Sequence, residues 1–347
     1  MKQNLREAML YEQLPNSRVR CHVCQWECVI NPDKFGLCKV RQNKEGKLYT
    51  LNYAIVSSAA VDPIEKKPLF HFFPGSQVFS LGGWGCNFHC QDCQNWQIAC
   101  VEELPAGSQI ISPQAAIETT KQNDCAGIAW TYNEPAIWFE YTLDSARLAR
   151  QNKLYTVYVT NGFLTTEALD TIGPFLDAWR VDIKGFSDAF YRNLAKVARW
   201  QGILEVARRA KEKWCMHVEV VTNLIPTMND DEEQLKGIAS WIVAELGELT
   251  PWHVTRFYPH HLMNHLSPTP TATLERAMAI GHEAGLRFVY AGNIPGHPGE
   301  NTVCYSCGKI AIKRWGYQVQ LLGLSDSKCQ SCGADLNIRS RIVERCA

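Results

Sequence analysis

The chain carries no excess of charge of either sign and no long hydrophobic run. Its 347 residues include 35 Lys and Arg against 35 Asp and Glu, and its pI is about 7.1. This balance excludes a global field that would attract nucleic acid or an anionic membrane. No run approaches the length that spans a bilayer, and residues 1–7 lack the apolar core of a secretion signal. We therefore expect a cytoplasmic protein without a membrane partner.

Cysteine, in contrast, is abundant, with 15 in the chain. Eleven of them fall into three spaced groups, which leaves Cys100, Cys125, Cys215 and Cys346 over. Grouped C-x2-C spacings in a chain without a secretion signal are typical of metal sites rather than of disulfides. The cysteines therefore predict several metal centres in a reducing compartment.

The central group is Cys86, Cys90 and Cys93, in a C-x3-C-x2-C spacing. Three thiolates this close can face one metal centre, but a closed zinc site or an ordinary cubane cluster needs four ligands. The group follows an apolar run at 77–81 and two glycines, so it lies just beyond the C-terminal end of a predicted strand. That is where α/β barrels keep their chemistry. The spacing predicts a [4Fe–4S] cluster with one iron open to another ligand.

From residue 76 to about 300, apolar runs alternate with helical patterns. Strands are predicted at 77–81, 127–131, 154–160, 179–184, 215–222, 253–258 and 287–291. Helices are predicted at 113–122, 136–151, 165–173, 187–212, 230–246 and 271–285. Ser112 and Asn229 are the expected N-caps of the first and fifth of these helices. The alternation predicts an α/β fold, with a parallel sheet curled into a partial barrel over residues 76–300.

Residues 1–75 form an N-terminal Cys-rich segment. A hairpin turn is predicted at 43–46, and the charged stretch 62–67 would by itself predict a solvated loop. The spacing of the N-terminal cysteines matches neither a ferredoxin run nor a common zinc ribbon, so zinc, a second iron–sulfur cluster and no metal all stay open. These cysteines are Cys21, Cys24, Cys28 and Cys38.

Residues 301–347 form a tail with two C-x2-C pairs, Cys304 with Cys307 and Cys329 with Cys332. A glycine follows each pair, as a tight metal-binding knuckle requires. The spacing predicts a zinc-ribbon-like tail with a structural zinc ion. A docking or nucleic-acid role is the alternative, but the tail has too few basic residues for phosphate binding to be favoured.

The stretches around the central cysteines resemble a known family. Residues 66–76 (KKPLFHFFPGS) and 85–88 (GCNF) are similar to the "AmmeMemoRadiSam system radical SAM enzyme" family, which is related to pyruvate formate-lyase activating enzymes. The resemblance covers nearly the whole chain. It implies that the cluster binds S-adenosylmethionine (SAM) and that a flavodoxin- or ferredoxin-type donor reduces it. SAM is then cleaved to a 5′-deoxyadenosyl radical. One departure is Asp92, because the superfamily often has an aromatic residue before the third cysteine.

In a barrel, functional residues lie at the ends of several strands. Glu134 stands where related enzymes have a Gly-Gly-Glu stretch, and the resemblance implies that it receives the SAM amino group. Asn161 would hydrogen-bond SAM. Asp182 and Lys184 share one face of their strand, and the resemblance implies that Lys184 reaches the SAM carboxylate, with an internal salt bridge as the alternative. Arg256, in the sixth predicted strand, is the last expected cofactor contact.

Three functional classes compete on the sequence. The first is a radical SAM enzyme, whose catalytic residues the sequence does not identify. The second is an iron–sulfur electron carrier, which would need a fourth cluster cysteine, and Cys100 is the candidate for it. The third is a zinc-dependent interaction or nucleic-acid module. Histidines 260, 261 and 265 suggest a metal, but loop histidines are more often solvated or bind substrate.

The target of the radical stays open at this stage. Kinship with activating enzymes implies a glycine of a glycyl radical enzyme as the substrate. Family membership implies instead AMMECR1-type and Memo-type proteins as partners, in a system that acts on a small molecule or on one of those partners.

Overall fold

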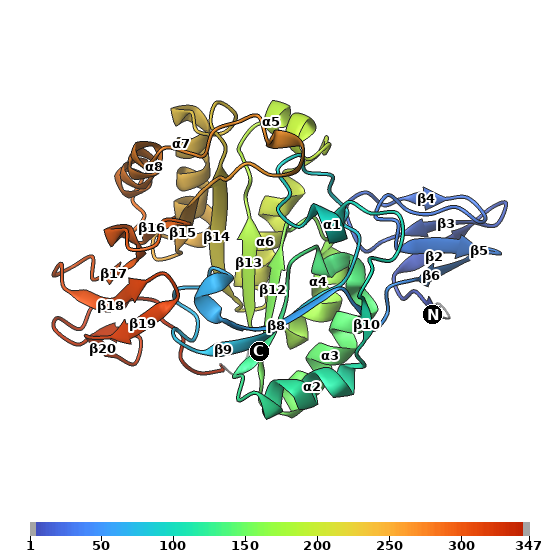
Figure 1. Ribbon diagram of the computed structural model, residues 1–347, viewed down its shortest axis with the longest axis horizontal. Helices are drawn as coiled ribbons and strands as arrows, with labels where there is room; N and C mark the ends of the chain where they lie inside the picture. Colours follow the sequence, from blue (N-terminus) through green and yellow to red (C-terminus); the bar gives the residue numbers. More distant parts are fainter. Residues whose placement is uncertain (1–4, 343–347) are drawn as a thin grey trace.

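The computed structural model describes residues 5–342, so Cys346 lies outside the described residues (Figure 1). Its centre is an eight-stranded sheet in the order β16-β15-β14-β13-β12-β11-β9-β8. The first seven strands of this order are mutually parallel, and β8 (Ser58–Pro63) runs antiparallel to β9 at one edge. The fold is therefore α/β with a mixed sheet.

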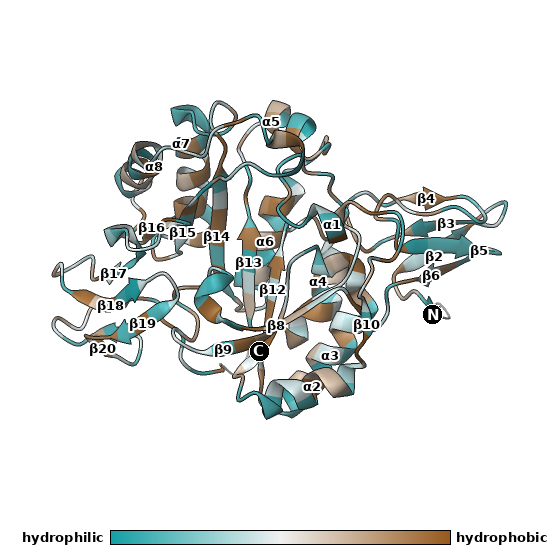
Figure 2. Ribbon diagram, in the orientation of Figure 1, coloured by the Kyte–Doolittle hydropathy of each residue, from teal (hydrophilic) through white to brown (hydrophobic). Residues whose placement is uncertain are grey.

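All seven predicted strands are confirmed to within a few residues. Their side chains are buried, because helices and loops cover a parallel sheet on both faces. Brown stretches run along the central strands in Figure 2 and are interrupted by teal and pale ones where polar residues stand. The strands are β9 (Gln77–Gly82), β11 (Gly127–Trp130), β12 (Tyr155–Thr160), β13 (Ala178–Asp182), β14 (His217–Leu224), β15 (Trp252–Arg256) and β16 (Val289–Gly292).

Helices fill the connections between these strands. The N-cap predicted for the helix at 113–122 is confirmed, because the Ser112 hydroxyl accepts a hydrogen bond from Ala115 N at 3.1 Å. No helix of the described chain is long and apolar enough to cross a membrane. The helices are α1 (Trp96–Ala99), α2 (Pro113–Gln122), α3 (Phe139–Gln151), α4 (Thr166–Ile172), α5 (Asp188–Leu194), α6 (Gly202–Glu212), α7 (Glu232–Trp241) and α8 (Thr271–Glu283).

The single helix predicted at 187–212 is wrong, because the structure breaks it into α5 and α6. Trp200, in the break, stacks on Tyr191 with ring centroids 4.9 Å apart. Its indole N–H also donates to Asp188 at 2.8 Å. The chain therefore folds back on α5, and tertiary packing overrides a continuous helical pattern.

The predicted cap of α7 is also wrong. Asp231, not Asn229, accepts a hydrogen bond from the backbone of Gln234. The Asn229 amide instead donates to the carbonyl oxygens of Lys184 at 2.6 Å and Asn223 at 2.8 Å. Asn229 thus ties together the ends of two neighbouring strands. After α7 the chain continues as a π turn at Ile242–Leu246.

The N-terminal segment forms two small antiparallel sheets and a separate strand pair. The predicted hairpin turn at 43–46 is confirmed, since it joins β5 to β6. Two contacts dock the segment on the main sheet's connections: the buried Arg41 guanidinium pairs with Glu140 at 2.7 and 2.9 Å, and Trp26 donates to Asn87 O at 2.7 Å. The strands are β1 (Arg6–Glu7), β2 (Tyr11–Leu14), β3 (Arg18–Cys21), β4 (Val29–Ile30), β5 (Arg41–Lys44), β6 (Lys47–Thr50), and β7 (Ile55–Val56) paired with β10 (Gln109–Ile110).

The tail packs beside β16, where it is red in Figure 1. Phe288 and Tyr290 share a small core with Ile312 and Leu336 of the tail. Arg314 is buried and donates to Phe70 O at 2.6 Å, so the tail is bound to the segment before β9. The strands are β17 (Thr302–Val303), β18 (Ile310–Trp315), β19 (Gln318–Leu321), β20 (Leu324–Ser325) and β21 (Lys328–Cys329).

Candidate cofactor site at the carboxyl ends of the strands

A cavity of about 710 Å³ lies at the carboxyl ends of the parallel strands. Cys86, Cys90 and Cys93 all line it, from the loop that follows β9. Ligand sites of open α/β sheets lie at this edge, because the strands there deliver their following loops to one place. The cavity is thus the candidate site, with three thiols in its wall.

Burial dominates the chemistry of these thiols. It raises the pKa of Cys86 well above the usual range, and it raises the pKa of Cys90 to about 12. A buried thiolate needs a cation or a metal beside it. The backbone N–H of Phe88 points at Cys86 Sγ at 3.4 Å, and such donors suit a ligating sulfur. Among the described residues these three sulfurs are not gathered within 4.8 Å of one another, and a cluster that they ligate stays a prediction.

Cys100 lies beside this group, after the short helix α1. A hydrogen bond with Cys93 and another with His89 lower the pKa of Cys100 to about 5, and the same bond raises the pKa of Cys93. Cys100 is not part of the cavity wall. The structure thus brings the fourth cysteine of the electron-carrier alternative close to the group but leaves it outside the cavity.

Glu134 lies beyond β11 and is buried in the cavity wall. Its Oε1 accepts from Ala136 N at 2.9 Å and from the Thr160 hydroxyl at 2.7 Å. Its Oε2 accepts from Asn161 N at 2.8 Å, which leaves Oε2 capacity for one further donor. Burial raises the pKa of Glu134 to about 7. A cationic ligand group facing Oε2 would favour the ionised carboxylate.

Asn161, Asp182 and Lys184 line the same cavity. Asn161 Nδ2 donates to Asn87 Oδ1 at 2.8 Å, which links the end of β12 to the cysteine loop. Lys184 Nζ lies 3.1 Å from Asp182 Oδ2, so the internal salt bridge exists. Burial alone would lower the pKa of Lys184, but the charge of Asp182 raises it well above its usual value. The ammonium keeps further N–H groups for a ligand.

Arg256 is not brought to this cavity. Its carbonyl accepts from Asn293 Nδ2 at 3.0 Å, and its guanidinium lies 5.3 Å from the centre of the Tyr258 ring. Its role as a SAM contact therefore stays a prediction. Of the loop histidines, His261 stacks on Trp96 with ring centroids 5.3 Å apart.

The solvated loop predicted at 62–67 is wrong. Asp62, Glu65 and Lys67 are buried. Lys67 Nζ and the Tyr132 hydroxyl both lie 2.7 Å from Asp62 Oδ2. Asp62 lies in β8 at the edge of the main sheet. Its carboxylate is therefore enclosed, whereas in a solvated loop it would be exposed. The sequence carried no periodic signal for this edge strand.

Sequence reasoning also missed the deeper wall of the cavity, where Arg180 and His253 lie. His253 Nε2 is 2.6 Å from Glu219 Oε2, and Glu219 also accepts from the backbone of Phe70 and His71. A signal existed for Arg180, because it stands two residues before Asp182 and alternation in a strand puts both on one face.

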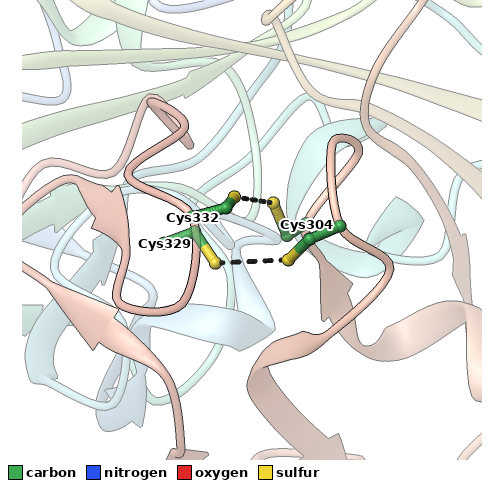
Figure 3. A group of neighbouring side chains, drawn as sticks. Cys304, Cys329 and Cys332 are labelled. Atoms are coloured by element: carbon green, nitrogen blue, oxygen red, sulfur yellow. Dashed lines mark hydrogen bonds between the residues drawn. The ribbon is translucent and has the colours of Figure 1, made fainter.

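The four tail cysteines meet as predicted (Figure 3). Their sulfur atoms lie within 4.8 Å of one another, with Cys304 Sγ 3.5 Å from Cys332 and Cys307 Sγ 3.7 Å from Cys329. Four thiols at this spacing fit one tetrahedral metal ion. Zinc itself stays a prediction.

The N-terminal cysteines are not gathered so tightly in the described chain. Burial raises the pKa of Cys24 well above its usual value and that of Cys38 to about 12. The nearby thiols Cys21 and Cys28 add to the first shift, so these sulfurs share one neighbourhood. A metal ion in this segment stays a prediction.

The fold and the site define an α/β protein with three cysteines in the wall of a cavity at the carboxyl ends of its parallel strands. Residues 83–239 match the radical SAM superfamily. The chain is 40% identical over 338 residues to the uncharacterized protein MJ0808 of Methanocaldococcus jannaschii. The aligned region covers 96% of this chain and 99% of that protein. The chain therefore belongs to one family with this archaeal protein, and it contains a segment that matches the radical SAM superfamily. The superfamily implies a [4Fe–4S] cluster and SAM as cofactors.

Similarity to activating enzymes is more partial. The isethionate sulfite-lyase activating enzyme of Nitratidesulfovibrio vulgaris is 29% identical over 153 residues, which span 43% of this chain and 49% of that enzyme. A domain of a pyruvate-formate lyase-activating enzyme from Bacteroides vulgatus covers 48% of this chain and 99% of that domain, with a TM-score of 0.41 and 17% identity. A structural likeness of this size carries no functional argument.

Proposed function

We propose that this chain is a radical SAM enzyme whose Cys86, Cys90 and Cys93 hold a [4Fe–4S] cluster. The observation that carries the proposal is that these three thiols share one cavity with Glu134 and Lys184. A carboxylate and an ammonium in one cavity suit the amino and carboxylate groups of the methionyl part of SAM. The seven parallel strands would then be the partial barrel of this superfamily.

The chain's own residues have three tasks in this proposal. Glu134 Oε2 accepts from the amino group of SAM, and Lys184 donates to its carboxylate. Asn161, held by Asn87 of the cysteine loop, keeps the end of β12 close to the cluster ligands. A cluster held by Cys86, Cys90 and Cys93 would, once reduced and with SAM bound, supply the chemistry of reductive SAM cleavage to methionine and a hydrogen-abstracting 5′-deoxyadenosyl radical.

We further propose that the tail cysteines bind a structural zinc ion and that a flavodoxin- or ferredoxin-type protein supplies the electron. The partial similarity to an activating enzyme supports a glycyl radical enzyme as one partner class. AMMECR1-type and Memo-type proteins are the other class, and with them the substrate is a small molecule or a partner. Electron paramagnetic resonance separates the two, since a persistent glycyl doublet on a partner marks activation.

The proposal is tested by anaerobic reconstitution of the full chain with iron and sulfide. The protein should gain the broad visible absorption of a [4Fe–4S] cluster, and it should form 5′-deoxyadenosine from SAM when a reductant is added. Cys90→Ala should lose both properties. Cys125→Ala is the matched control, because Cys125 is also buried but is not part of the cavity wall.

A cluster that never cleaves SAM would support the electron carrier instead. Cleavage by Cys90→Ala at the wild-type rate would remove the basis of the proposal.

A further inference from the structure

The cavity wall also includes charged and polar residues other than the expected SAM contacts, and the part that they line is here called the deep subsite. Its wall comes from four separate parts of the chain: the segment before β9, strands β13 and β15, and the tail with the loop that precedes it. The wall residues that matter for binding are Glu65, Lys67, Arg180, His253, Glu300 and Tyr317.

Three of these residues present buried polar atoms without a hydrogen-bond partner. They are His253 Nδ1, Glu65 Oε2 and Arg180 Nε. His253 and Glu65 are 0% and 2% exposed, so water in the bulk does not satisfy them. Buried polar atoms are nearly always paired, and each exception calls for an explanation. With Asp92 Oδ1, beside Cys93, four such exceptions lie in the wall of one cavity, and the three of the deep subsite point to a ligand that supplies the missing partners.

Whether each unpaired atom is a hydrogen-bond donor or an acceptor indicates which group the ligand has to supply. Glu219 is a carboxylate, because its two histidine partners hold its pKa well below the usual range, so the bonded His253 Nε2 carries the proton. His253 Nδ1 is then a lone-pair acceptor and needs a donor from the ligand. Glu65 Oε2 needs a donor too, since only Oε1 accepts a backbone bond, from Gly75 N at 2.9 Å.

The other side of the subsite offers donors. Arg180 Nε–H is unpaired, and Lys67 Nζ bonds Asp62 with one of its three N–H groups. Guanidinium and ammonium groups placed side by side bind carboxylate or phosphate oxygens. The ligand therefore carries an oxyanion at one end and a donor at the other.

The tail closes the subsite. Glu300 Oε2 accepts from Gly316 N at 3.2 Å and from Gly296 N at 2.8 Å. These two hydrogen bonds connect the turn between β18 and β19 to the loop after β16. This turn places Tyr317 in the cavity wall. The volume of the whole cavity, about 710 Å³, suits a small molecule beside SAM.

We propose that the deep subsite binds the substrate, and that the substrate is a small molecule with a carboxylate or phosphate group and a hydroxyl or amine donor. Arg180 and Lys67 bind the oxyanion, and His253 Nδ1 accepts from the donor. This inference rests on the proposed function, because it places the substrate beside SAM in one cavity. It goes beyond that function by assigning the substrate class and its contacts.

The test measures binding to the reconstituted, SAM-loaded full chain by isothermal titration calorimetry. The probes are glycerate, glycerol 3-phosphate and propionate, of which propionate lacks the donor. At least one of the first two should bind about tenfold or more tightly than propionate, since propionate leaves the histidine unpaired. Whichever of glycerate and glycerol 3-phosphate binds more tightly shows whether the subsite prefers a carboxylate or a phosphate.

Variants locate the bound probe. His253→Phe should weaken the better probe about tenfold or more, while SAM affinity stays within about twofold. Arg180→Met should weaken the probe by a similar factor, and because Arg180 also pairs with Asp182 beside Lys184, its SAM affinity is measured separately. Tyr317→Ala, at a half-exposed position that folding tolerates, should weaken it about threefold. Lys236→Met, on the exposed face of α7, is the control and should change nothing.

Unchanged affinity in all three wall variants would overturn the inference, as would binding of none of the probes. Binding of a glycine-containing peptide alone would also overturn it, in favour of a protein substrate. Failure of the wild-type chain to bind SAM would instead count against the proposed function itself.

Discussion

The carbonyl oxygen of Cys38 lies so close to Gly85 that a Cβ atom on Gly85 would come within 2.6 Å of it. Gly85 also has a φ of +78°, a region that other residues rarely adopt. The N-terminal cysteine segment therefore packs directly against the residue that precedes Cys86. The loop of the central cysteines takes its shape from two sides, the sheet and this segment.

Gly85→Ala should strongly reduce cluster loading, because the added methyl group forces the cysteine loop or the N-terminal segment to move. Iron and sulfide per chain measure the effect. Gly107→Ala is a matched control, since Gly107 has a φ of +82° and a methyl group added there would meet no heavy atom within 4 Å. It should lose about 1–2 kcal/mol of stability from backbone strain and keep its iron. Full iron content in Gly85→Ala would show that the contact does not constrain the loop.

Cys100→Ser should keep the cluster and the cleavage of SAM, because Cys100 stands outside the cavity wall. Cys93→Ser should lose both. Iron content and 5′-deoxyadenosine formation are the two readouts. The reverse result, with Cys100 required for the cluster, would favour four-cysteine ligation and the electron carrier.

Lys184→Ala and Glu134→Ala should each weaken SAM binding by about 1.5–3 kcal/mol, the value of a lost charge-assisted hydrogen bond. Equilibrium dialysis with labelled SAM measures this, and iron content should not change. Arg256→Ala tests the remaining expected contact in the same assay. SAM affinity unchanged in both of the first two variants would remove Lys184 and Glu134 from the site.

Binding of an oxyanion in the deep subsite should weaken as the pH rises through about 8. Burial lowers the pKa of Lys67 to about 8, although the hydrogen bond and the charge of Asp62 oppose the shift, and Lys66 and Arg180 add to it by repulsion. Lys67 thus carries its charge below this pH and loses it above. Calorimetric titrations of glycerate between about pH 7 and 9 would show the decline. Lys67→Gln should bind more weakly at neutral pH and show no such decline.

Removal of the tail metal should weaken binding in the deep subsite and leave SAM binding unchanged. Metal analysis should find zinc in the wild type and none in Cys332→Ser, which should keep cluster iron and SAM affinity. Its affinity for the probes of the deep subsite should fall, because the turn that carries Tyr317 belongs to the same tail. Loss of SAM binding along with the zinc would show that the tail supports the whole cavity.

The strands could be predicted because each parallel strand is a buried apolar run bounded by turn residues. The central cysteines could be predicted because ligand spacing is local in the sequence. The deep subsite could not, since its contacts join distant segments: His253 meets Glu219, and Glu219 meets Phe70, 149 positions away. A charged stretch such as 62–67 looks solvated until the tail and β9 cover it.

Arg314 sets a limit on how this protein can be divided. Its guanidinium lies 4.2 Å from the centre of the Phe70 ring and donates to Phe70 O, and its Nε is 3.8 Å from the buried Glu65 carboxylate. A chain shortened at residue 300 would leave that carboxylate without its cation and uncover the aromatic cluster around Phe70. Such a truncation should yield an aggregating product rather than a smaller enzyme. Any attempt to exchange the tail between relatives has to carry the 65–70 segment with it.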